Sequence, residues 1–374
     1  MIRTELTRRL GVEAPLVGFN RSPEVVIEVS RAGGLGVLAV TPYTPEQLDA
    51  QLTWIEERLD GRPYGVDLLL PAKRVEGDAD DYLRSLRAQI PEEHLRFVDG
   101  LMDKYGISKA GTTSADNWAT SLSPSGVDEL LEVAFAHDIS LIASALGTPP
   151  SWMVTRAKET GVAVAALVGA GKHAQRQLDL GVDILVAQGT EAGGHTGTVS
   201  TMVLTPEIVD LGAQAGVPVL AAGGIASGRQ MAAALTLGAA GVWCGSVWLS
   251  SNEDITPDVV KRKFLAARST DTLRSPTRTG KPARQLRTVW HDEWEREDAP
   301  KPLPMPLQSL LVRDLWEEID REAEAGEPGA QELASFYIGQ AVGSFQRLRP
   351  TREITERMIA ECEAELRRAG GLLG

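Results

Sequence analysis

The chain has 374 residues, of which 43% are hydrophobic, enough for a large core in one α/β barrel or in two ordinary domains. Its 38 basic and 51 acidic side chains give a formal net charge of −13, which argues against general affinity for nucleic acid or for anionic membranes. The two cysteines lie far apart, so neither a disulfide framework nor a zinc site is expected. Because no signal-peptide core and no bilayer-spanning apolar stretch is present, we expect a cytoplasmic protein.

Short apolar runs alternate with amphipathic helical patterns from the start of the chain. The runs predict buried strands, and their alternation with helices is the βαβ rhythm of a parallel sheet. Three strands are expected in this first part, over 15–18, 35–40 and 64–70.

The rhythm breaks over residues 72–138. This segment is charged and then rich in Gly, Thr and Ser, and it contains predicted helices over 78–89 and 126–137. An insertion of this length in a βα loop suits a cap over a site or a contact with a partner subunit, as in a homodimer. A simple surface excursion explains the pattern equally well.

Strand and helix patterns then resume. Five further strands are expected over 140–146, 162–168, 182–187, 218–222 and 241–244, each followed by a loop and a helix. Eight such units predict an α/β fold, a (β/α)8 TIM barrel over residues 1–250 with the long insertion after strand three. Residues 251–374 are expected to form a C-terminal extension, with helices over 307–325 and from Thr351 onward packing on the barrel.

The loop over 188–197 is the most informative stretch of the sequence. Four glycines surround one imidazole, that of His195. Dense glycine indicates unusual dihedral angles or the close approach of a ligand to the backbone. A titratable side chain beside a ligand on bare backbone suggests a redox or proton-transfer site. A tight surface loop with an incidental histidine is the simpler interpretation.

Two more glycine loops follow strands seven and eight, at 223–228 and 245–246. A TIM barrel often holds a phosphate in these two places, and the helix that follows each loop favours an anion at its N-terminus. Tight turns without a ligand would use the same glycines.

The Gly-rich loop at 169–174 resembles a dinucleotide fingerprint but lacks an acidic residue at the end of the next strand, so we interpret it as an ordinary barrel turn.

The remaining polar residues give weaker signals. His94, His137 and His291 lie in charged surroundings and are expected to be solvated. No metal-type spacing and no nucleophile motif is present, so metal and covalent catalysis lack support. The basic stretch 268–287 suits an anionic substrate tail, but a solvated face or salt bridges to the acidic run 291–298 are favoured.

Several of these stretches resemble the nitronate monooxygenase family, formerly called 2-nitropropane dioxygenases. The resemblance runs from about Pro15 to the end of the chain, apart from the insertion, and flavin-dependent enoyl-thioester reductases of the same superfamily share the Glu-Ala-Gly-Gly-His run. The stretches that carry it are 32–36, 64–67, 188–197, 221–225, 241–246 and 338–343.

The resemblance implies FMN in the mouth of the barrel and His195 as the catalytic histidine. Three places depart from the family pattern: Asp67 replaces an asparagine that contacts the flavin, residues 18–20 replace Ala-Pro-Met, and Trp243 on strand eight replaces a frequent glutamine. The implied cofactor-binding residues are Asp67, Gln188, Gly193, Gly194, Gly223, Gly224, Gly245 and Ser246.

The resemblance implies oxidation of an alkyl nitronate with O2 to a carbonyl compound and nitrite as the leading function. His195 would remove the α-proton from a neutral nitroalkane. In the alternative, NAD(P)H reduces the flavin, which then reduces an enoyl or related acyl thioester. A flavin-binding protein without turnover is the third interpretation, because Asp67 and residues 18–20 depart from the family.

Overall fold

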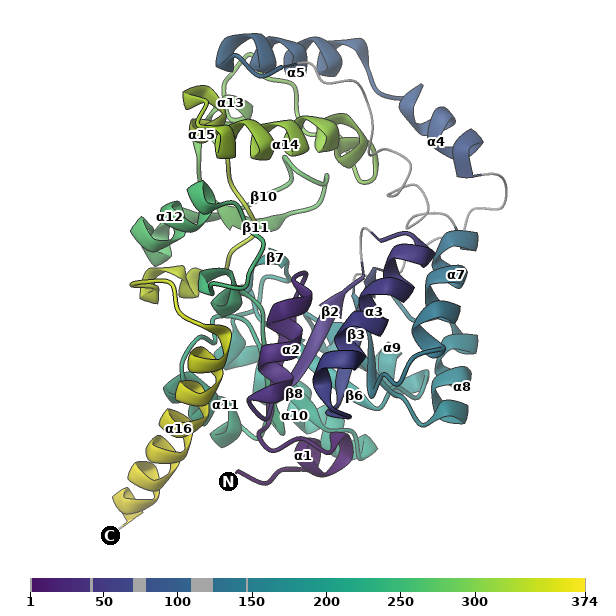
Figure 1. Cartoon of the computed structure of the whole chain (residues 1–374), viewed down its shortest axis with the longest axis vertical. Helices are drawn as coiled ribbons and strands as arrows, with labels where there is room; N and C mark the ends of the chain where they lie inside the picture. The colour runs from purple at the N-terminus through teal and green to yellow at the C-terminus, as the bar shows by residue number, and fades with distance from the viewer. Residues whose placement is uncertain (1, 41–42, 70–78, 109–123, 146, 374) are drawn as a thin grey trace.

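Eight parallel strands form the centre of the molecule. The computed structural model describes residues 2–40, 43–69, 79–108, 124–145 and 147–373 (Figure 1). The strands close into a barrel in the order β1-β2-β3-β4-β5-β6-β8-β9, so the predicted TIM barrel is confirmed. The strands are β1 (Leu16–Asn20), β2 (Leu35–Ala39), β3 (Tyr64–Leu69), β4 (Leu141–Ala145), β5 (Ala163–Val168), β6 (Ile184–Gln188), β8 (Val219–Ala222) and β9 (Gly241–Cys244).

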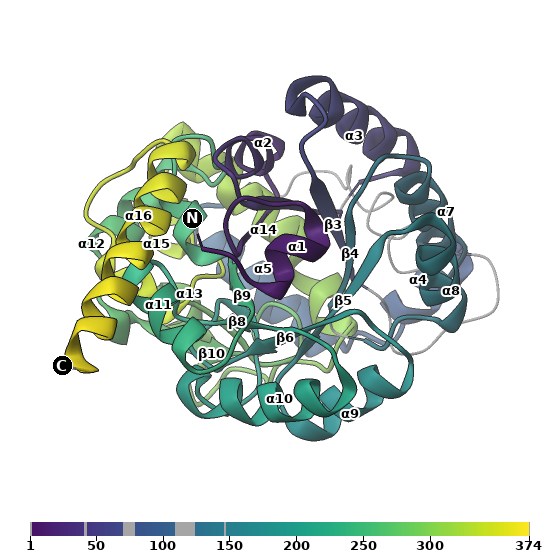
Figure 2. The same ribbon diagram turned by 90° about the horizontal axis from the view of Figure 1, so that it is seen from below.

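Helices surround the barrel, and α1 (Glu5–Leu10) lies across its lower end (Figure 2). Alternate strand residues point inward and outward. Val17, Val37 and Val186 share the barrel interior with Leu6 of α1, while the outward residues pack against the helices. The surrounding helices are α2 (Pro23–Arg31), α3 (Pro45–Leu59), α7 (Pro124–Phe135), α8 (Ser151–Thr160), α9 (Gly171–Asp179), α10 (Thr201–Ala215) and α11 (Gly228–Thr236).

A second group of helices lies above the barrel (Figure 1). Helices α4 (Ala79–Arg87) and α5 (Glu92–Tyr105) come from the insertion, and α5 is an element that the sequence pattern did not predict. The others come from the C-terminal extension: α13 (Val289–Trp294), α14 (Leu307–Ala325) and α15 (Pro328–Leu333). The domain limits at 72–138 and 250–251 stay predictions.

Contacts across this upper layer join the insertion to the C-terminal extension. The rings of Phe97 and Trp294 lie 4.8 Å apart, centroid to centroid. The Lys104 Nζ and Tyr105 hydroxyl groups donate to the same Glu293 carboxylate oxygen at 2.5 and 2.6 Å. Segments that are almost two hundred residues apart in the chain therefore form one packed layer.

A small antiparallel sheet lies between the barrel and the upper helices (Figure 1). It consists of β10 (Thr272–Ser275), β11 (Ala283–Leu286) and the two-residue strand β7 (Gly194–His195). The register pairs Ala283 with His195 and Arg284 with Gly194. The sequence did not predict this sheet, because its strands are short and one of them lies inside the glycine-rich loop.

The long helix α16 (Thr351–Gly370) runs along the outside of the barrel beside α11 (Figure 1). Its buried residues include Ile354, Met358 and Cys362. The remaining elements are α12 (Asp258–Ala266), η1 (Ser246–Ser250), η2 (Ser269–Asp271), η3 (Gln340–Ser344) and η4 (Gly371–Leu373). Within the described ranges, none of the helices combines the length and apolarity that crossing a bilayer requires.

The expectation that three histidines are solvated is wrong. His94 is 5% exposed with Nε2 2.9 Å from the Lys301 carbonyl oxygen, and His291 is 1% exposed. The side chain of His137 is 8% exposed, and its two ring nitrogens lie within hydrogen-bond distance of the Asp49 and Glu56 carboxylates. His94 and His291 lie on helices whose packing is not visible in a single sequence, and His137 follows α7 and pairs with carboxylates of α3.

Replacing Gly228 by alanine tests the docking of α16. A Cβ at this position would lie 2.3 Å from the Met358 carbonyl oxygen and 2.4 Å from the Cys362 nitrogen, so the helices would have to separate. We expect G228A to lower the free energy of unfolding by about 1–3 kcal/mol in urea denaturation. The control G100A, on α5 with open space around the added Cβ, should stabilise by about 0.5–1 kcal/mol. Equal stability of G228A and wild type would contradict close packing of α16 on α11.

Candidate active site

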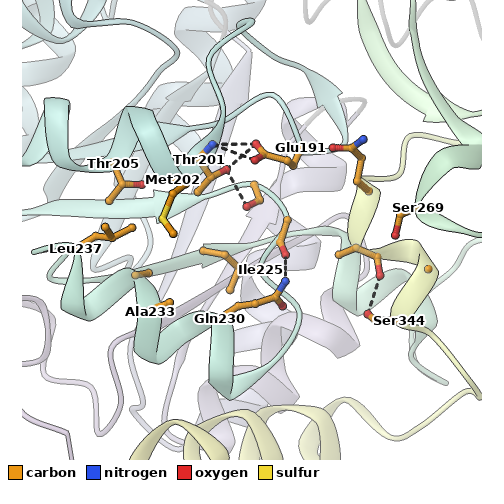
Figure 3. A pocket seen from close by; sticks show the side chains of 16 residues that line it. Glu191, Thr201, Met202, Thr205, Ile225, Gln230, Ala233, Leu237, Ser269 and Ser344 are labelled. Carbon is orange, nitrogen blue, oxygen red and sulfur yellow. Dashed lines mark hydrogen bonds between the residues drawn. The ribbon is translucent and has the colours of Figure 1, made fainter. Parts of the chain in front are cut away.

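The glycine loop after β6 is fixed to the start of α10 by Glu191. One carboxylate oxygen accepts hydrogen bonds from the Thr201 backbone N–H and hydroxyl, both at 2.9 Å (Figure 3). The carboxylate thus lies at the N-terminus of α10, where the helix dipole favours negative charge. Thr190 also donates from its backbone to the Val199 carbonyl at 2.8 Å. The sequence analysis did not single out Glu191, although it lies inside the motif.

Two arginines of the β10–β11 hairpin hold the same loop from the other side. Arg284 Nε donates to the Thr190 carbonyl at 2.9 Å, and Arg274 donates to the Thr196 carbonyl at 2.7 Å. These side chains are not part of a solvated face. Arg287 instead forms ion pairs with Asp292 and Glu295 at 2.7 and 2.6 Å, the expected salt bridge to the acidic run.

His195 contacts a hydroxyl group that determines its tautomer. Its Nε2 lies 2.8 Å from the Thr279 hydroxyl oxygen, and that hydroxyl donates its proton to the Lys281 carbonyl at 3.1 Å. With the hydroxyl proton on the Lys281 carbonyl, the oxygen accepts from an N–H on Nε2, and this arrangement leaves the lone pair on Nδ1. Thr279 was not predicted, since it lies 84 residues away in sequence.

Burial keeps this imidazole uncharged. Burial, together with the nearby positive charge of Lys281, lowers the pKa of His195 to about 4. The ring of Tyr337 lies 6.4 Å away, centroid to centroid. At neutral pH the side chain is a neutral hydrogen-bonding group and a weak base.

The loop after β8 presents free backbone donors. Gly223 and Gly224 have φ of 105° and 70°, values that favour glycine. The backbone N–H groups of Gly224 and Ile225 donate to no other residue in the described part of the chain. Helix α11 begins three residues later, with the Ser227 hydroxyl accepting from the Gln230 N–H. The geometry fits a bound anion.

A cavity of about 460 Å³ borders this loop on the side of α10 and α11 (Figure 3). His195 does not line it. Apolar side chains of α10 and α11 face polar groups of the loops, and the segment 340–344 forms another wall. The lining residues are Glu191, Thr201, Met202, Thr205, Gly223, Gly224, Ile225, Gln230, Ala233, Ala234, Leu237, Ser269, Gln340, Ala341, Gly343 and Ser344.

The predicted residues Ser246 and Gly193 meet through the C-terminal segment. The Gly339 N–H donates to the Ser246 hydroxyl oxygen at 2.8 Å, and the Gln340 N–H donates to the Glu191 carbonyl at 2.9 Å. A Cβ on Gly193 would lie 3.0 Å from the Gly339 nitrogen. Residues 338–343 therefore pass between the two predicted binding loops. Gly245 directly precedes η1, and Ser246 is its first residue.

Asp67 and Gln188 come from different walls of the barrel. Asp67 on β3 pairs with Ala39 and Ala143 and is 5% exposed, and its carboxyl group has no hydrogen bond or ion pair among the described residues. Burial raises the pKa of Asp67 to about 8, so its carboxyl group is protonated at neutral pH. Gln188 is the last residue of β6, where it pairs with Ala222.

Residues 18–20, which depart from the family pattern, contribute to the rim of the barrel. The rings of Phe19 and Trp243 stack at 6.0 Å. The Asn20 amide donates to the Asp254 carboxylate at 2.9 Å and its oxygen accepts from the Ser22 N–H at 2.7 Å. Asn20 therefore has a structural role in the first βα loop.

The chain matches one protein family over almost its whole length. The family model described as nitronate monooxygenase matches residues 3–361. The chain belongs to the nitronate monooxygenase family. It is therefore an enzyme, an oxidoreductase that acts on a small-molecule substrate, and the interpretation as a binding protein without turnover is set aside.

Two proteins of Mycobacterium tuberculosis are similar to this chain over most of its length. One, provisionally named a monooxygenase, is 54% identical over 367 residues, or 96% of each chain. The other, named as an octahydroindene-carboxyl-CoA dehydrogenase, is 33% identical over 406 residues, with coverage of 100% of this chain and 99% of its own.

A solved structure supports the fold alone. Nitroalkane oxidase from Streptomyces ansochromogenes superposes with a TM-score of 0.77, at 24% identity and with coverage of 97% of this chain and 99% of its own.

The protonation of Asp67 predicts a pH-dependent stability. An unfolded chain loses this proton near pH 3.8, whereas the folded chain keeps it to about 8. The free energy of unfolding of wild type should therefore fall, relative to that of D67N, as the pH rises between these values, by a few kcal/mol in total. Urea midpoints of both proteins at mildly acidic and mildly alkaline pH check this. Contributions from the buried histidines are common to both proteins and cancel, so parallel pH profiles would show that Asp67 is ionised in the folded protein.

Proposed function

We propose that the protein binds FMN at the mouth of the barrel. The free N–H groups of Gly224 and Ile225 suit the phosphate, with Gly223 providing the turn. Gly245 and Ser246 are proposed to complete the phosphate site. Because the Ser246 oxygen accepts from Gly339, its hydroxyl proton is available to an anion. When bound, FMN supplies the electron acceptor for substrate oxidation.

Asp67, Gln188, Gly193 and Gly194 are the residues proposed to surround the isoalloxazine ring. The protonated carboxyl group of Asp67 is a neutral hydrogen-bonding group, as is the asparagine amide that the family places there. This substitution is therefore compatible with a flavin site and introduces no negative charge near neutral pH.

We propose the oxidation of alkyl nitronates with O2 as the activity. One observation carries this choice: His195, proposed as the catalytic residue, is a neutral weak base close to the positive charge of Lys281. An anionic nitronate has already lost its α-proton, so it needs a hydrogen-bonding and positively charged environment more than a strong base. A neutral nitroalkane would depend on Nδ1 of His195 for proton removal.

The visible spectrum of the purified protein tests the cofactor and the activity together. We expect a yellow protein that loses its visible flavin absorbance when mixed anaerobically with ethyl nitronate, and that releases nitrite once O2 is admitted. A colourless protein that FMN does not reconstitute would refute the flavin site. A yellow protein that does not react with the nitronate would refute the proposed activity and leave the cofactor in place.

Variants at His195 and Thr279 separate the two kinds of substrate. We expect H195Q and T279V to lower the rate with neutral nitroethane by about 10²-fold or more, and to affect preformed ethyl nitronate much less. T279S keeps the hydroxyl and should behave like wild type. Because the pKa of His195 is about 4, the rate of wild type with nitroethane should show no His195-dependent fall between neutral pH and about pH 5. Equal losses on both substrates would contradict a role for His195 in proton removal.

A second function is favoured by one specific comparison. The relative that is 33% identical over the whole chain is named for a carboxyl-CoA thioester. The corresponding candidate activity is flavin-dependent redox chemistry on an acyl thioester, with NAD(P)H as the reductant. Steady NAD(P)H consumption with an enoyl-CoA, by a yellow protein inert to nitronates, would select this function.

A further inference from the structure

Two largely buried guanidinium groups lie against the aromatic side chains of residues 336 and 337 and take no part in holding the glycine loop. Arg21 follows β1 directly, and Arg278 lies in the loop between β10 and β11. Both pack against the ring of Phe336, with the Cζ atoms 4.0 Å and 5.4 Å from its centroid. Two segments that are far apart in sequence thus place two positive charges beside the same aromatic ring.

Among the residues that the structure describes, each guanidinium has a single hydrogen bond. Arg278, which is 8% exposed, donates to the Ser335 carbonyl at 3.0 Å. Arg21 donates to the Thr256 hydroxyl at 3.2 Å, and its Nε is buried with no acceptor. A guanidinium has five N–H donors, so most of the donors of both groups have no acceptor in the described part of the chain.

No carboxylate in the described part of the chain forms an ion pair with either arginine. Asp320 is near enough for both positive charges to act on its pKa, but one of its buried oxygens has no hydrogen-bond partner. The oxygens of Asp254 accept instead from Asn20 and from the Thr256 backbone. Burying a charge without a direct partner lowers the stability of the fold by several kcal/mol. Such unpaired charges are therefore typical of sites where a ligand supplies the partner.

Tyr337 and Thr279 link Arg278 to the proposed catalytic residue, His195. The Arg278 Cζ lies 5.2 Å from the centre of the Tyr337 ring, and that ring lies 6.4 Å from the His195 ring. Thr279, the hydrogen-bond partner of His195, directly follows Arg278. The Tyr337 hydroxyl has no hydrogen-bond partner among the described residues, and it is a further donor beside Arg278.

We propose that Arg21, Arg278 and the Tyr337 hydroxyl form a subsite for a carboxylate group of the substrate, at the far end from the atom that reacts beside His195. The reaction named here rests on the proposed function, but the subsite does not. The planar fork of a guanidinium matches a carboxylate with two parallel hydrogen bonds. Asp254 and Asp320 already offset part of the positive charge, so a singly charged carboxylate fits better than a doubly charged phosphate.

The aromatic surroundings support the same ligand. Arg278 stacks on Trp316 with its Cζ 3.7 Å from the ring centroid, and Phe336 and Tyr337 flank it. Stacking fixes the guanidinium plane and leaves its edge for hydrogen bonding. Aromatic rings around a guanidinium group whose N–H edge is held in place suit a short organic acid, which has an apolar chain and one carboxylate.

Calorimetric titration of the purified flavin-loaded protein tests the subsite without turnover. The probes are butanoate, its neutral analogue butanamide, and inorganic phosphate. We expect butanoate to bind to wild type and butanamide to bind at least about tenfold more weakly. We expect R278M to lose at least about tenfold in butanoate affinity, and R21Q to show a similar loss. R278K, which keeps the charge but not the fork, should bind with intermediate affinity.

The control variant is R58M. Arg58 also lies over an indole ring, that of Trp54 at 4.2 Å, but on α3 away from these residues, so its loss should leave butanoate affinity unchanged. Having two independent arginine variants guards against one that fails to fold, which circular dichroism would reveal. Butanoate affinity that is equal in wild type, R278M and R21Q would overturn the proposal. So would absence of butanoate binding to wild type, or tighter binding of phosphate at these arginines. Inertness to nitronates would leave this result unaffected.

Discussion

The site depends on holding a glycine-rich loop in one conformation. Four glycines in a short segment cannot do this by themselves, because each has a wide choice of backbone angles. The loop is held from two directions: the Glu191 carboxylate ties it to the start of α10, and Arg274 and Arg284 bind its carbonyl groups from the hairpin. The position of His195 between these attachments, and its contact with Thr279, follow from this double anchoring.

Burial then decides the charge states of the polar groups. His195 and Asp67 are both neutral near neutral pH, although an imidazole and a carboxyl group respond to burial with pKa shifts of opposite direction. Cationic side chains of the hairpin and of the first βα loop lie near the barrel mouth, together with the carboxylates of Glu191, Asp254 and Asp320. The net charge of −13 therefore does not describe the charges of this region, where both signs occur.

The barrel could be predicted from the sequence, whereas the surroundings of His195 could not. Alternating apolar runs and helical patterns are local signals, and each of the eight predicted strands overlaps an observed one. Thr279, Arg274 and Arg284 approach the loop across 78 to 94 residues of sequence, and nothing local marks them. The burial of His94 was missed for the same reason, because its partner, the Lys301 carbonyl oxygen, lies 207 residues away in the C-terminal extension.

The passage of residues 338–343 between the two loops has a consequence for biosynthesis. Gly339 contacts Ser246 across 93 residues of sequence, and the intervening chain includes the hairpin that anchors His195. The barrel strands emerge from the ribosome well before this segment does. Any molecule that needs the completed loops must therefore bind after synthesis of the C-terminal extension has passed this point. Until then the nascent barrel exposes the apolar surfaces that α16 and the upper helices later cover, and it is in this interval that the chain is most exposed to aggregation.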